Sequence, residues 1–379
     1  MAKAPSAPVA VSRRPRRVLL IALVVLVAVA VAGSAYLWRG SSGPALTLST
    51  NSSDLQTFTC LSDHRCLGAT VNDMESSADG GSTWVSGPTA VGDLGNGDLE
   101  SMQCRDGRCY AVGGSPPVAG VYTTNDLRHW VRHDIPWTKR SDFFAWSLDC
   151  VSARECFVGG GNGQSNDPGS LYRTLDGGAT WQRLNLPAKT AMVWSLSCPT
   201  SSDCVALAGL VPAQIPMGAG SDGFRVIVST DGGRRWAVSY SSANYTPGTV
   251  SCAGEHCVVA SRPNQDLPAL GTGPVLISDD GGRTWRAQRG NGRRPNAVAC
   301  PSVSRCVGLD VVEKSLVYAG LSRDGGATWD WQVLPFPASA ALVYLPNDPQ
   351  LQCLSTTSCV ALTTSNHAAG EYFVRIGVK

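Results

Sequence analysis

The hydrophobic residues of this chain fall mainly in short alternating runs that are separated by turn-forming residues. In one unit, Val-Trp-Ser-Leu-Ser-Cys at 193–198 is followed by the turn formers 199–203 and then by Cys-Val-Ala-Leu-Ala at 204–208. Alternation of apolar and polar residues is typical of half-buried β-strands, and Pro, Ser, Thr and Asp between the runs mark turns. The 41 glycines and 23 prolines agree with many short strands rather than with helices. The pattern therefore predicts an all-β protein.

One stretch does not follow this pattern. Residues 18–38 are 21 consecutive uncharged positions, which is long enough for one helix to cross a bilayer. A basic tail with five Lys and Arg residues precedes the stretch, whereas only Arg39 follows it closely, so the positive-inside rule keeps the tail in the cytoplasm. We predict a cytoplasmic tail at 1–17, a transmembrane helix at 18–38, a flexible linker at 39–44 and an extracytoplasmic domain at 45–379.

A cleaved signal peptide is the alternative interpretation of the same stretch. Gly33-Ser34-Ala35 offers small residues for cleavage, and the domain would then be secreted. The apolar run continues through Trp38, which favours an uncleaved membrane anchor. Both interpretations place the large domain outside the cytoplasm.

The cysteines form seven close pairs, and each pair lies between two apolar runs. Four or five residues separate the two cysteines of a pair: Cys60 and Cys66, Cys104 and Cys109, Cys150 and Cys156, Cys198 and Cys204, Cys252 and Cys257, Cys300 and Cys306, Cys353 and Cys359. Outside the cytoplasm, locally paired cysteines indicate disulfides, each closing one hairpin and contributing roughly 2 kcal/mol. Zinc is the weaker alternative, because the five histidines are too few and too scattered. We expect no bound metal and no cofactor.

A second repeat is interleaved with the cysteine pairs. The pattern Ser-Asp-Asp-Gly-Gly-Arg-Thr-Trp at 278–285 recurs at 77–84, 174–181, 229–236 and 322–329, and a copy one residue shorter covers 124–130. Its aspartates recur every 44–55 residues, at Asp79, Asp126, Asp176, Asp231, Asp280 and Asp324. A period of this length indicates stacked supersecondary units.

The residues of the pattern predict a tight turn that closes a β-hairpin. We expect the aspartate to accept hydrogen bonds from N–H groups two or three residues further on, and the two glycines to adopt positive φ. The tryptophan opens the next strand and brings a large apolar surface to a neighbour. Because six copies of one turn share one local task, we interpret these aspartates as structural and not catalytic.

The order of the two repeats predicts the architecture. Each unit reads strand, cysteine hairpin, strand, loop, strand, aspartate turn, strand, which is the four-stranded blade of a β-propeller. The last unit has a cysteine pair and a strand at 371–378 but no fourth strand. A strand at 45–49 precedes the first cysteine pair and completes that blade, so that no sheet edge is left open. We predict a seven-bladed propeller.

The consensus S-x-D-x-G-x-T-W resembles the Asp-box, or bacterial neuraminidase repeat, over nearly all of the chain after about residue 45. The resemblance implies a propeller but no single activity. Sialidases share the repeat, but they are six-bladed and depend on an Arg-Ile-Pro motif that this sequence lacks. Seven-bladed glycoside hydrolases that pair two propellers, and non-enzymatic photosystem assembly factors, are more similar in blade number. No catalytic residue is carried over from any of these families.

Candidate binding residues lie on one face of the predicted ring. The cysteine turns and the Asp-box turns share a face, so the loops of variable length occupy the opposite one, where binding is usual. The connection into the third blade brings Arg140, Phe143 and Trp146, and Trp194 occupies the matching position of the fourth blade. Such aromatic side chains stack sugars or peptides; the alternative is that they pack between blades.

Charged residues on the same face provide further candidates. Arg293 and Arg294 predict a site for an anion or an acidic partner, with a solvated loop as the alternative. Glu100 begins an inner strand, but a lone carboxylate is not the pair that glycoside hydrolysis requires.

These features favour a membrane-anchored binding or scaffold propeller that recognises an unknown protein or glycan on the face opposite the Asp-box turns. The alternative is a glycoside hydrolase or sialidase-like enzyme that processes glycans. Nucleic acid is not an expected partner, because the net charge is only +2 and no nucleic-acid motif is present.

Overall fold

The computed structural model divides the chain into two units, Met1–Ser42 and Gly43–Lys379. The structure describes residues 45–51, 55–70, 73–86, 99–113, 120–135, 144–161, 169–210, 223–263, 273–288, 292–312, 316–334, 350–363 and 371–378. The predicted tail, transmembrane segment and linker lie outside these ranges. Within them, no helix has the length and apolar character needed to cross a bilayer.

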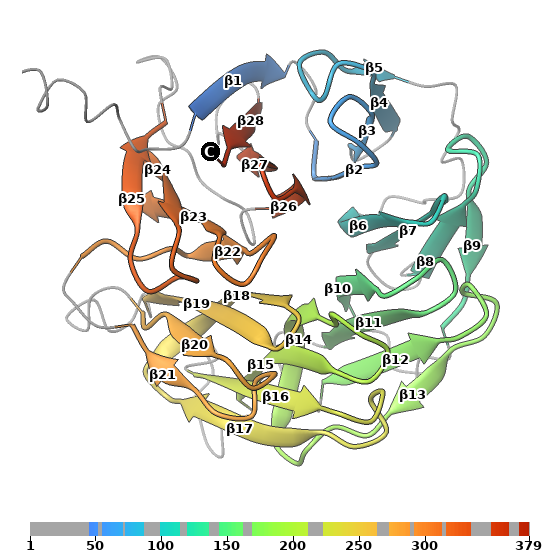
Figure 1. The fold of residues 1–379 in the computed structure, drawn as a ribbon. Coiled ribbons are helices and arrows are strands. Elements are labelled where there is room, and N and C mark those ends of the chain that lie inside the picture. Colours follow the sequence, from blue (N-terminus) through green and yellow to red (C-terminus); the bar gives the residue numbers. More distant parts are fainter. Residues whose placement is uncertain are drawn as a thin grey trace, which may run out of the picture. The chain divides into compact units, whose positions relative to one another are not determined.

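The described residues of the second unit form seven antiparallel sheets of four strands each (Figure 1). Blades 1 to 3 consist of β2 (Thr57–Cys60), β3 (Cys66–Ala69), β4 (Met74–Ser77) and β5 (Val85–Ser86); β6 (Leu99–Arg105), β7 (Arg108–Gly113), β8 (Gly120–Thr124) and β9 (Val131–His133); and β10 (Phe144–Cys150), β11 (Cys156–Gly161), β12 (Ser170–Thr174) and β13 (Gln182–Leu184).

Blades 4 to 7 repeat the same order of strands. They consist of β14 (Thr190–Ser197), β15 (Cys204–Leu210), β16 (Phe224–Ser229) and β17 (Ala237–Ser242); β18 (Tyr245–Ala253), β19 (His256–Pro263), β20 (Leu276–Ser278) and β21 (Arg286–Ala287); β22 (Ala297–Ala299), β23 (Cys306–Val312), β24 (Leu316–Ser322) and β25 (Asp330–Val333); and β26 (Gln350–Ser355), β27 (Ser358–Thr363), β28 (Glu371–Gly377) and β1 (Ala45–Asn51).

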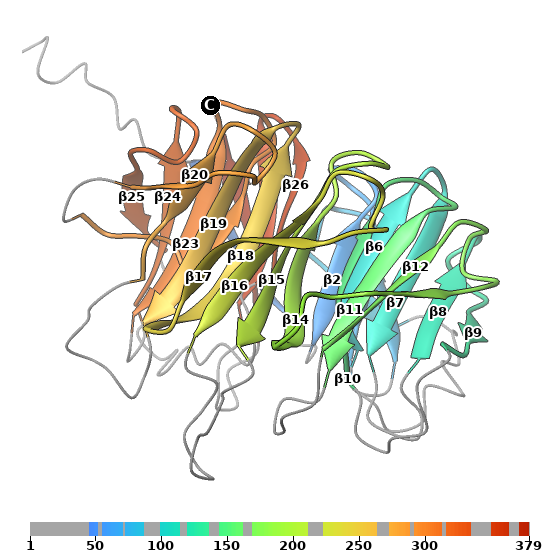
Figure 2. The ribbon, with the colours of Figure 1, turned by 90° about the horizontal axis from the view of Figure 1, so that it is seen from below.

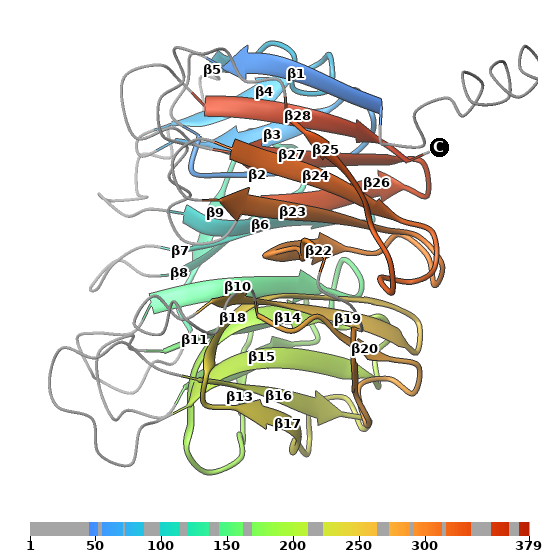
Figure 3. The same cartoon turned by 90° about the vertical axis from the view of Figure 1, so that its left-hand side faces the viewer.

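The two ends of the propeller meet in blade 7. Strand β1 pairs antiparallel with β28, from Ala45 opposite Gly377 to Asn51 opposite Glu371, and Figure 3 shows the two strands side by side. The first strand of each blade lies next to the first strand of the following blade, and β26 lies next to β2. Figure 2 shows these strands running alongside one another. The prediction of a seven-bladed propeller closed by the N-terminal strand is confirmed.

The hydrophobic core is divided among the seams between blades. Each of the seven clusters of buried apolar residues draws its members from two neighbouring blades. All residues of the middle strand β11, for example, are buried, because neighbouring sheets cover both of its faces. At the closing seam Phe373 of blade 7 packs edge-on against Phe58 of blade 1, with ring centroids 5.0 Å apart. Each blade is therefore completed by its neighbours.

The Asp-box residues form the predicted turn, with one difference in its hydrogen bonds. The Oδ1 atom of Asp79 accepts the backbone N–H of Thr83 at 2.8 Å, and Oδ2 accepts the Thr83 hydroxyl at 2.6 Å. In the complete copies the stronger of the backbone bonds spans four residues, because the two glycines lengthen the turn, and the expected N–H three residues on makes a weaker contribution, as Ser82 does to Asp79. The expected spacing holds in the short copy, where Asp126 accepts the N–H groups of Arg128 and His129.

The cysteine turns and the Asp-box turns lie together on one face, as predicted. In all five complete copies the first box glycine donates its N–H to a carbonyl of the cysteine turn in the same blade, as Gly80 does to His64 at 2.8 Å. Both box glycines have positive φ, +72° at Gly80 and +89° at Gly81. The tryptophan of each box packs into the seam with the preceding blade, and the buried Trp181 and Trp236 are examples.

All seven predicted disulfides are present. Each joins the two cysteines of one pair across its turn, with Cα atoms 3.9–4.1 Å apart. No free cysteine remains among the described residues. Each disulfide links the first strand of a blade to the second, next to the turn that connects them. These turns lie on the face that also carries the box turns.

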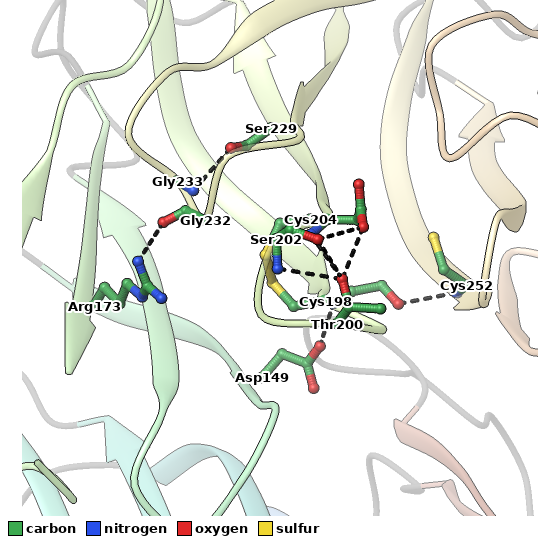
Figure 4. The surroundings of a disulfide bond; sticks show 12 residues. Asp149, Arg173, Cys198, Thr200, Ser202, Cys204, Ser229, Gly232, Gly233 and Cys252 are labelled. Carbon is green, nitrogen blue, oxygen red and sulfur yellow. Dashed lines mark hydrogen bonds between the residues drawn. A yellow bond between two sulfur atoms is a disulfide. The ribbon is translucent and has the colours of Figure 1, made fainter. Parts of the chain in front are cut away.

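At three of the seams on this face, an arginine or histidine side chain reaches the backbone carbonyl of a box glycine in the next blade. Arg173 of blade 3 donates to the carbonyl of Gly232 in blade 4 at 2.7 Å (Figure 4), and Arg375 of blade 7 donates to Gly80 of blade 1 at 3.1 Å. In blade 5 the buried His256 has its Nε2 atom 3.1 Å from the carbonyl of Gly325 in blade 6. Its Nδ1 atom lies 2.6 Å from a carboxylate oxygen of Asp279, and this hydrogen bond lowers the pKa of Asp279.

The closing seam predicts how two glycine substitutions differ. A Cβ atom at Gly81 would lie 2.2 Å from the Phe373 ring, whereas one at Gly107 would meet nothing within 4 Å, although both glycines have positive φ. We expect Gly107→Ala to cost about 1 kcal/mol for its φ alone, and Gly81→Ala to cost a further 1–3 kcal/mol, roughly, for overlap with the ring. Urea unfolding under non-reducing conditions measures both; equal costs would contradict the tight closing seam.

The box hydrogen bonds predict a loss of stability in acid. Hydrogen bonds from the Thr hydroxyl and N–H lower the pKa of Asp79, Asp176 and Asp280 from 3.8 to about 2. A lowered folded-state pKa stabilises the fold above pH 3.8, and this contribution disappears as the pH falls towards 2. We expect Asp280→Asn to flatten the dependence of the urea midpoint on pH between 4 and 2. An Asp280→Asn slope equal to that of the wild type would contradict the assignment.

Candidate functional site on the inner strands

Three candidate residues occupy equivalent β-bulges on the inner strands of successive blades. The register of β6 with β7 shifts between Leu99 and Ser101, so Glu100 is the extra residue. Trp146 on β10 and Trp194 on β14 are the extra residues of the corresponding shifts. All three stand four positions before the first cysteine of their blade. A bulge re-aims a side chain, and we call these three residues the inner rim.

The inner rim combines an aromatic pair with a carboxylate. The indoles of Trp146 and Trp194 meet edge to face, with centroids 5.0 Å apart and an interplanar angle of 80°. Both indoles and Glu100 are partly exposed. The Nε1 atom of Trp194 is buried and has no hydrogen-bond partner among the described residues. The two tryptophans therefore both pack between blades and keep some accessible surface, so the two interpretations from the sequence are compatible.

One amide side chain links the inner rim to the closing seam. Gln350 of β26 accepts the N–H of Phe58 at 3.1 Å and the Thr57 hydroxyl at 2.8 Å through Oε1. Its Nε2 atom donates to the backbone carbonyls of Gln56 at 3.0 Å and Glu100 at 3.1 Å. A single side chain of blade 7 thus holds the backbone of blades 1 and 2 and fixes the bulge that carries Glu100.

Polar side chains form a belt around the inner strands one residue before the first cysteine. In five of the seven seams this side chain accepts the N–H of the first cysteine in the next blade: Gln103 to Cys150, Asp149 to Cys198, Ser197 to Cys252, Ser251 to Cys300 and Gln352 to Cys60. Figure 4 shows Asp149 aimed at the backbone of Cys198. We call these five acceptors the belt. It connects inner strands that do not share a sheet.

Asp149 is the charged member of the belt. Burial raises the pKa of its carboxyl, while hydrogen bonds from the Cys198 N–H and the Gln103 amide, at 3.0 Å, oppose this rise. Glu100 and Asp149 are the carboxylates of the described inner strands. Asp149 is engaged with the backbone of the next blade, and so these two residues do not form a matched acid and nucleophile of the kind that hydrolases use.

The structure places the other candidate residues elsewhere or does not describe them. Arg140 and Phe143 lie outside the described residues. Arg293 forms an ion pair with the buried Asp310 and lies 3.4 Å from the centroid of the Tyr318 ring. Arg294 donates to the carbonyl of Gly273 at 3.4 Å. Both arginines belong to blade 6, whereas the aromatic pair lies on the inner strands of blades 3 and 4. An anion-binding site at the arginines therefore remains a separate prediction.

The belt and Gln350 were missed in the sequence, although a signal was present. The residue before the first cysteine is polar in six of the seven units: Thr59, Gln103, Asp149, Ser197, Ser251 and Gln352, with Ala299 as the exception. Aligning the units on their cysteines would have revealed this column. It would not have shown that the bonds run between blades.

Sequence and structure together define the class of this protein, a seven-bladed β-propeller with BNR/Asp-box repeats. The family model for the BNR/Asp-box repeat matches residues 276–287, within the fifth copy along the chain. None of the curated protein sequences matches the chain. Among described groups of His, Cys, Asp and Glu, none is arranged to hold a metal ion.

Solved structures with the same fold bind or act on different molecules. "YCF48 bound to D1 peptide" is 16% identical, with a TM-score of 0.58, over 88% of this chain and 97% of that one. An inactive variant of virginiamycin B lyase from Staphylococcus aureus, with quinupristin, is 8% identical, with a TM-score of 0.58, over 89% and 100%. The GH74 enzyme of Niastella koreensis is 12% identical, with a TM-score of 0.50, over 84% and 65%. At these identities the similarity concerns the fold alone.

The belt predicts a structural role for Asp149. Asp149→Ala leaves the Cys198 N–H and the Gln103 amide without their acceptor, and each buried unpaired group costs about 1–3 kcal/mol. We expect a corresponding drop in unfolding free energy by urea, a smaller one for Asp149→Asn, which keeps one acceptor, and none for the exposed control Asp73→Ala. Stability equal to the wild type in Asp149→Ala would show that the belt bond is dispensable.

Proposed function

We propose that the chain is a membrane-anchored, extracytoplasmic binding or scaffold propeller, whose ligand contacts the face opposite the Asp-box turns and reaches the inner rim. The proposal rests on one observation, which is how the polar side chains of the inner strands are engaged in hydrogen bonds. The belt side chains and Gln350 are committed to hydrogen bonds between blades, and Asp149 is one of them. The surface that we assign to the ligand is the partly exposed aromatic pair of Trp146 and Trp194, in bulges equivalent to the one that carries Glu100.

The seven disulfides support a location outside the cytoplasm, because reducing conditions in the cytoplasm keep thiols free. The uncharged stretch 18–38 and the basic residues before it support an anchor whose N-terminus stays inside. The likeness to a propeller that is bound to a peptide agrees with a binding role. A rigid ring with variable loops on one face suits this task.

A glycan-processing enzyme is the second candidate, favoured by one observation. The fold is shared with a GH74 enzyme, and a partly exposed carboxylate, Glu100, stands at the same register as two tryptophans. Turnover of fluorogenic glycosides by the purified chain, lost in Glu100→Gln, would establish this alternative in place of a scaffold.

Topology is tested by fractionation and mass measurement. We expect the full chain to remain in membranes after alkaline washing, to keep residues 1–38, and to be cut by protease added from outside the cell. A form that lacks residues 18–38 should be released. A mature chain that begins after Ala35 and appears in the medium would contradict the anchor.

Ligand contact is tested by photo-crosslinking in intact cells. A photoreactive amino acid in place of Glu100 should give a discrete adduct, whereas the same group in place of Trp331, on the outer strand β25, should not. The comparison separates contact at the inner rim from contact anywhere on the surface. Adducts from position 331 alone would place the ligand on the outer edge of the blades and contradict the proposal.

A further inference from the structure

His256 makes the contact across its seam that an arginine makes at two others. Arg173 and Arg375 each donate to the carbonyl of the first box glycine in the next blade. These arginines also pair with carboxylates, Glu155 at 2.6 Å and Asp63 at 3.4 Å respectively. A guanidinium keeps its charge, whereas an imidazole loses its charge between about pH 5 and 8. The seam between blades 5 and 6 is thus crossed by a side chain whose charge depends on pH.

Both ring nitrogens of His256 face groups that only accept hydrogen bonds. Nδ1 lies 2.6 Å from Oδ1 of Asp279, and Nε2 lies 3.1 Å from the carbonyl oxygen of Gly325. An ionised carboxylate and a backbone carbonyl have no proton to give, and a neutral imidazole has a single N–H, so only the imidazolium donates to both. The hydrogen bond from His256 lowers the pKa of Asp279, which keeps this carboxylate ionised near neutral pH. The observed geometry is therefore that of a protonated ring.

The other charged side chains of the two turns at this seam are engaged within their own blades. They are Glu255, Asp280 and Arg286 in blade 5 and Arg305, Arg323 and Asp324 in blade 6. Arg286 donates to the second carboxylate oxygen of Asp279 at 3.2 Å. Asp280 and Asp324 accept the threonine hydroxyls of their own boxes, both at 2.6 Å. The Asp279 carboxylate is the charged group that His256 contacts, so a change in the charge of the ring acts on the bonds to Asp279 and Gly325.

The bond across the seam is the one that loss of the proton removes. A hydrogen bond to an ionised carboxylate is about twice as strong as one to a neutral carbonyl, so the single proton of the neutral ring stays on Nδ1 beside Asp279. Nε2 then presents a lone pair to the carbonyl oxygen of Gly325, and two acceptors in direct contact repel each other. The side chain of His256 is buried, so this repulsion falls on the packing between the two blades.

We infer that His256, Asp279 and Gly325 form a pH-dependent latch between blades 5 and 6, closed when the ring is protonated and released when the ring loses its proton. Mild acid therefore tightens this seam on the face of the turns, and a rise in pH loosens it. The seams crossed by Arg173 and Arg375 keep their bonds throughout, so the change is confined to one place in the ring. The inference goes beyond the proposed binding function and does not depend on it.

Fluorine NMR of the full chain in detergent, labelled with fluorotryptophan, follows the latch. Trp329 is the reporter, because the second box glycine of blade 6 lies between this ring and blade 5: a Cβ atom at Gly326 would be 3.2 Å from Val258 and 3.6 Å from Trp329. Trp236 is the reference, since an arginine crosses its seam. We expect the Trp329 signal to shift in one step as the pH falls from about 8 to about 5, the range in which an imidazole titrates, and the Trp236 signal to stay. Trp329→Phe and Trp236→Phe assign the two signals.

Two variants and a control separate the latch from an unrelated titration. His256→Gln removes the titrating ring, and the shift of the Trp329 signal should disappear, whereas His133→Gln, in blade 2, should keep it. Asp279→Asn should hold the latch closed, because an amide N–H can donate to Nδ1 while the neutral ring carries its proton on Nε2 and still donates to Gly325. The Trp329 signal of Asp279→Asn should therefore stay at its acid position up to about pH 8.

Nitrogen NMR of the histidine rings gives the protonation state directly. We expect both ring nitrogens of His256 to carry a proton at about pH 5 and only Nδ1 to carry one at about pH 8. His256→Gln assigns these signals by their loss.

Several results would overturn the inference. A Trp329 signal that does not move, that moves equally in His256→Gln, or that moves together with Trp236 would exclude a latch at this seam. A His256 ring that keeps its proton on Nε2 at high pH would retain the bond to Gly325 and exclude its release. An Asp279→Asn chain that titrates as the wild type does would contradict the role of the second acceptor. If His256→Gln does not fold, Asp279→Asn and the nitrogen signals decide the outcome. None of these measurements involves a ligand, so the proposed function is tested separately.

Discussion

The burial of both faces of every sheet is the constraint on which the rest of the structure depends. Each hydrophobic cluster belongs to two blades, so a single blade would expose an apolar face on either side. Burial of such surface contributes about 25 cal/mol for each Å² and is available only when neighbours are present. The ring must therefore close, and strand β1 closes it by hydrogen bonding to β28 along its whole length. The N- and C-terminal strands of the propeller depend on each other for stability.

Polar contacts between blades then fix the relative position of sheets that the apolar seams hold together. On the inner strands the belt joins the N–H of one cysteine to a side chain of the preceding blade, as Ser197 joins Cys252. On the face of the turns, arginine or histidine side chains reach box carbonyls across a seam, as Arg375 reaches Gly80. These bonds are directional, whereas hydrophobic burial is not, and so they select one arrangement of the blades. The disulfides act at a shorter range, because each one closes a single hairpin.

The same bonds limit what the inner strands can do chemically. Asp149 lies where a catalytic carboxylate might be sought, but its oxygens accept bonds from Cys198 and Gln103. Gln350 uses both ends of its amide to hold three blades together. The bulges of blades 2 to 4 are different, since the extra residue of each has a large or charged side chain that stays partly exposed while the flanking residues remain in register. The proposed binding at the inner rim agrees with this arrangement, and the Asp-box turns are bonded to the cysteine turns of their own blades.

The repeat determined the fold because its glycines and its cysteine pairs each encode a local turn, and its spacing sets the length of one blade. With seven such hairpins in order, the N-terminal strand is what completes the last sheet. Trp146 and Trp194 were found from the sequence because they are aromatic residues at matching positions of two blades, and Glu100 because it begins an inner strand. Only the tertiary structure showed that they are bulge residues, that Asp149 is bound to the next blade, and that Asp310 balances Arg293. Those facts depend on contacts between residues 11 to 49 positions apart, and the local pattern does not record which side chain meets which backbone there.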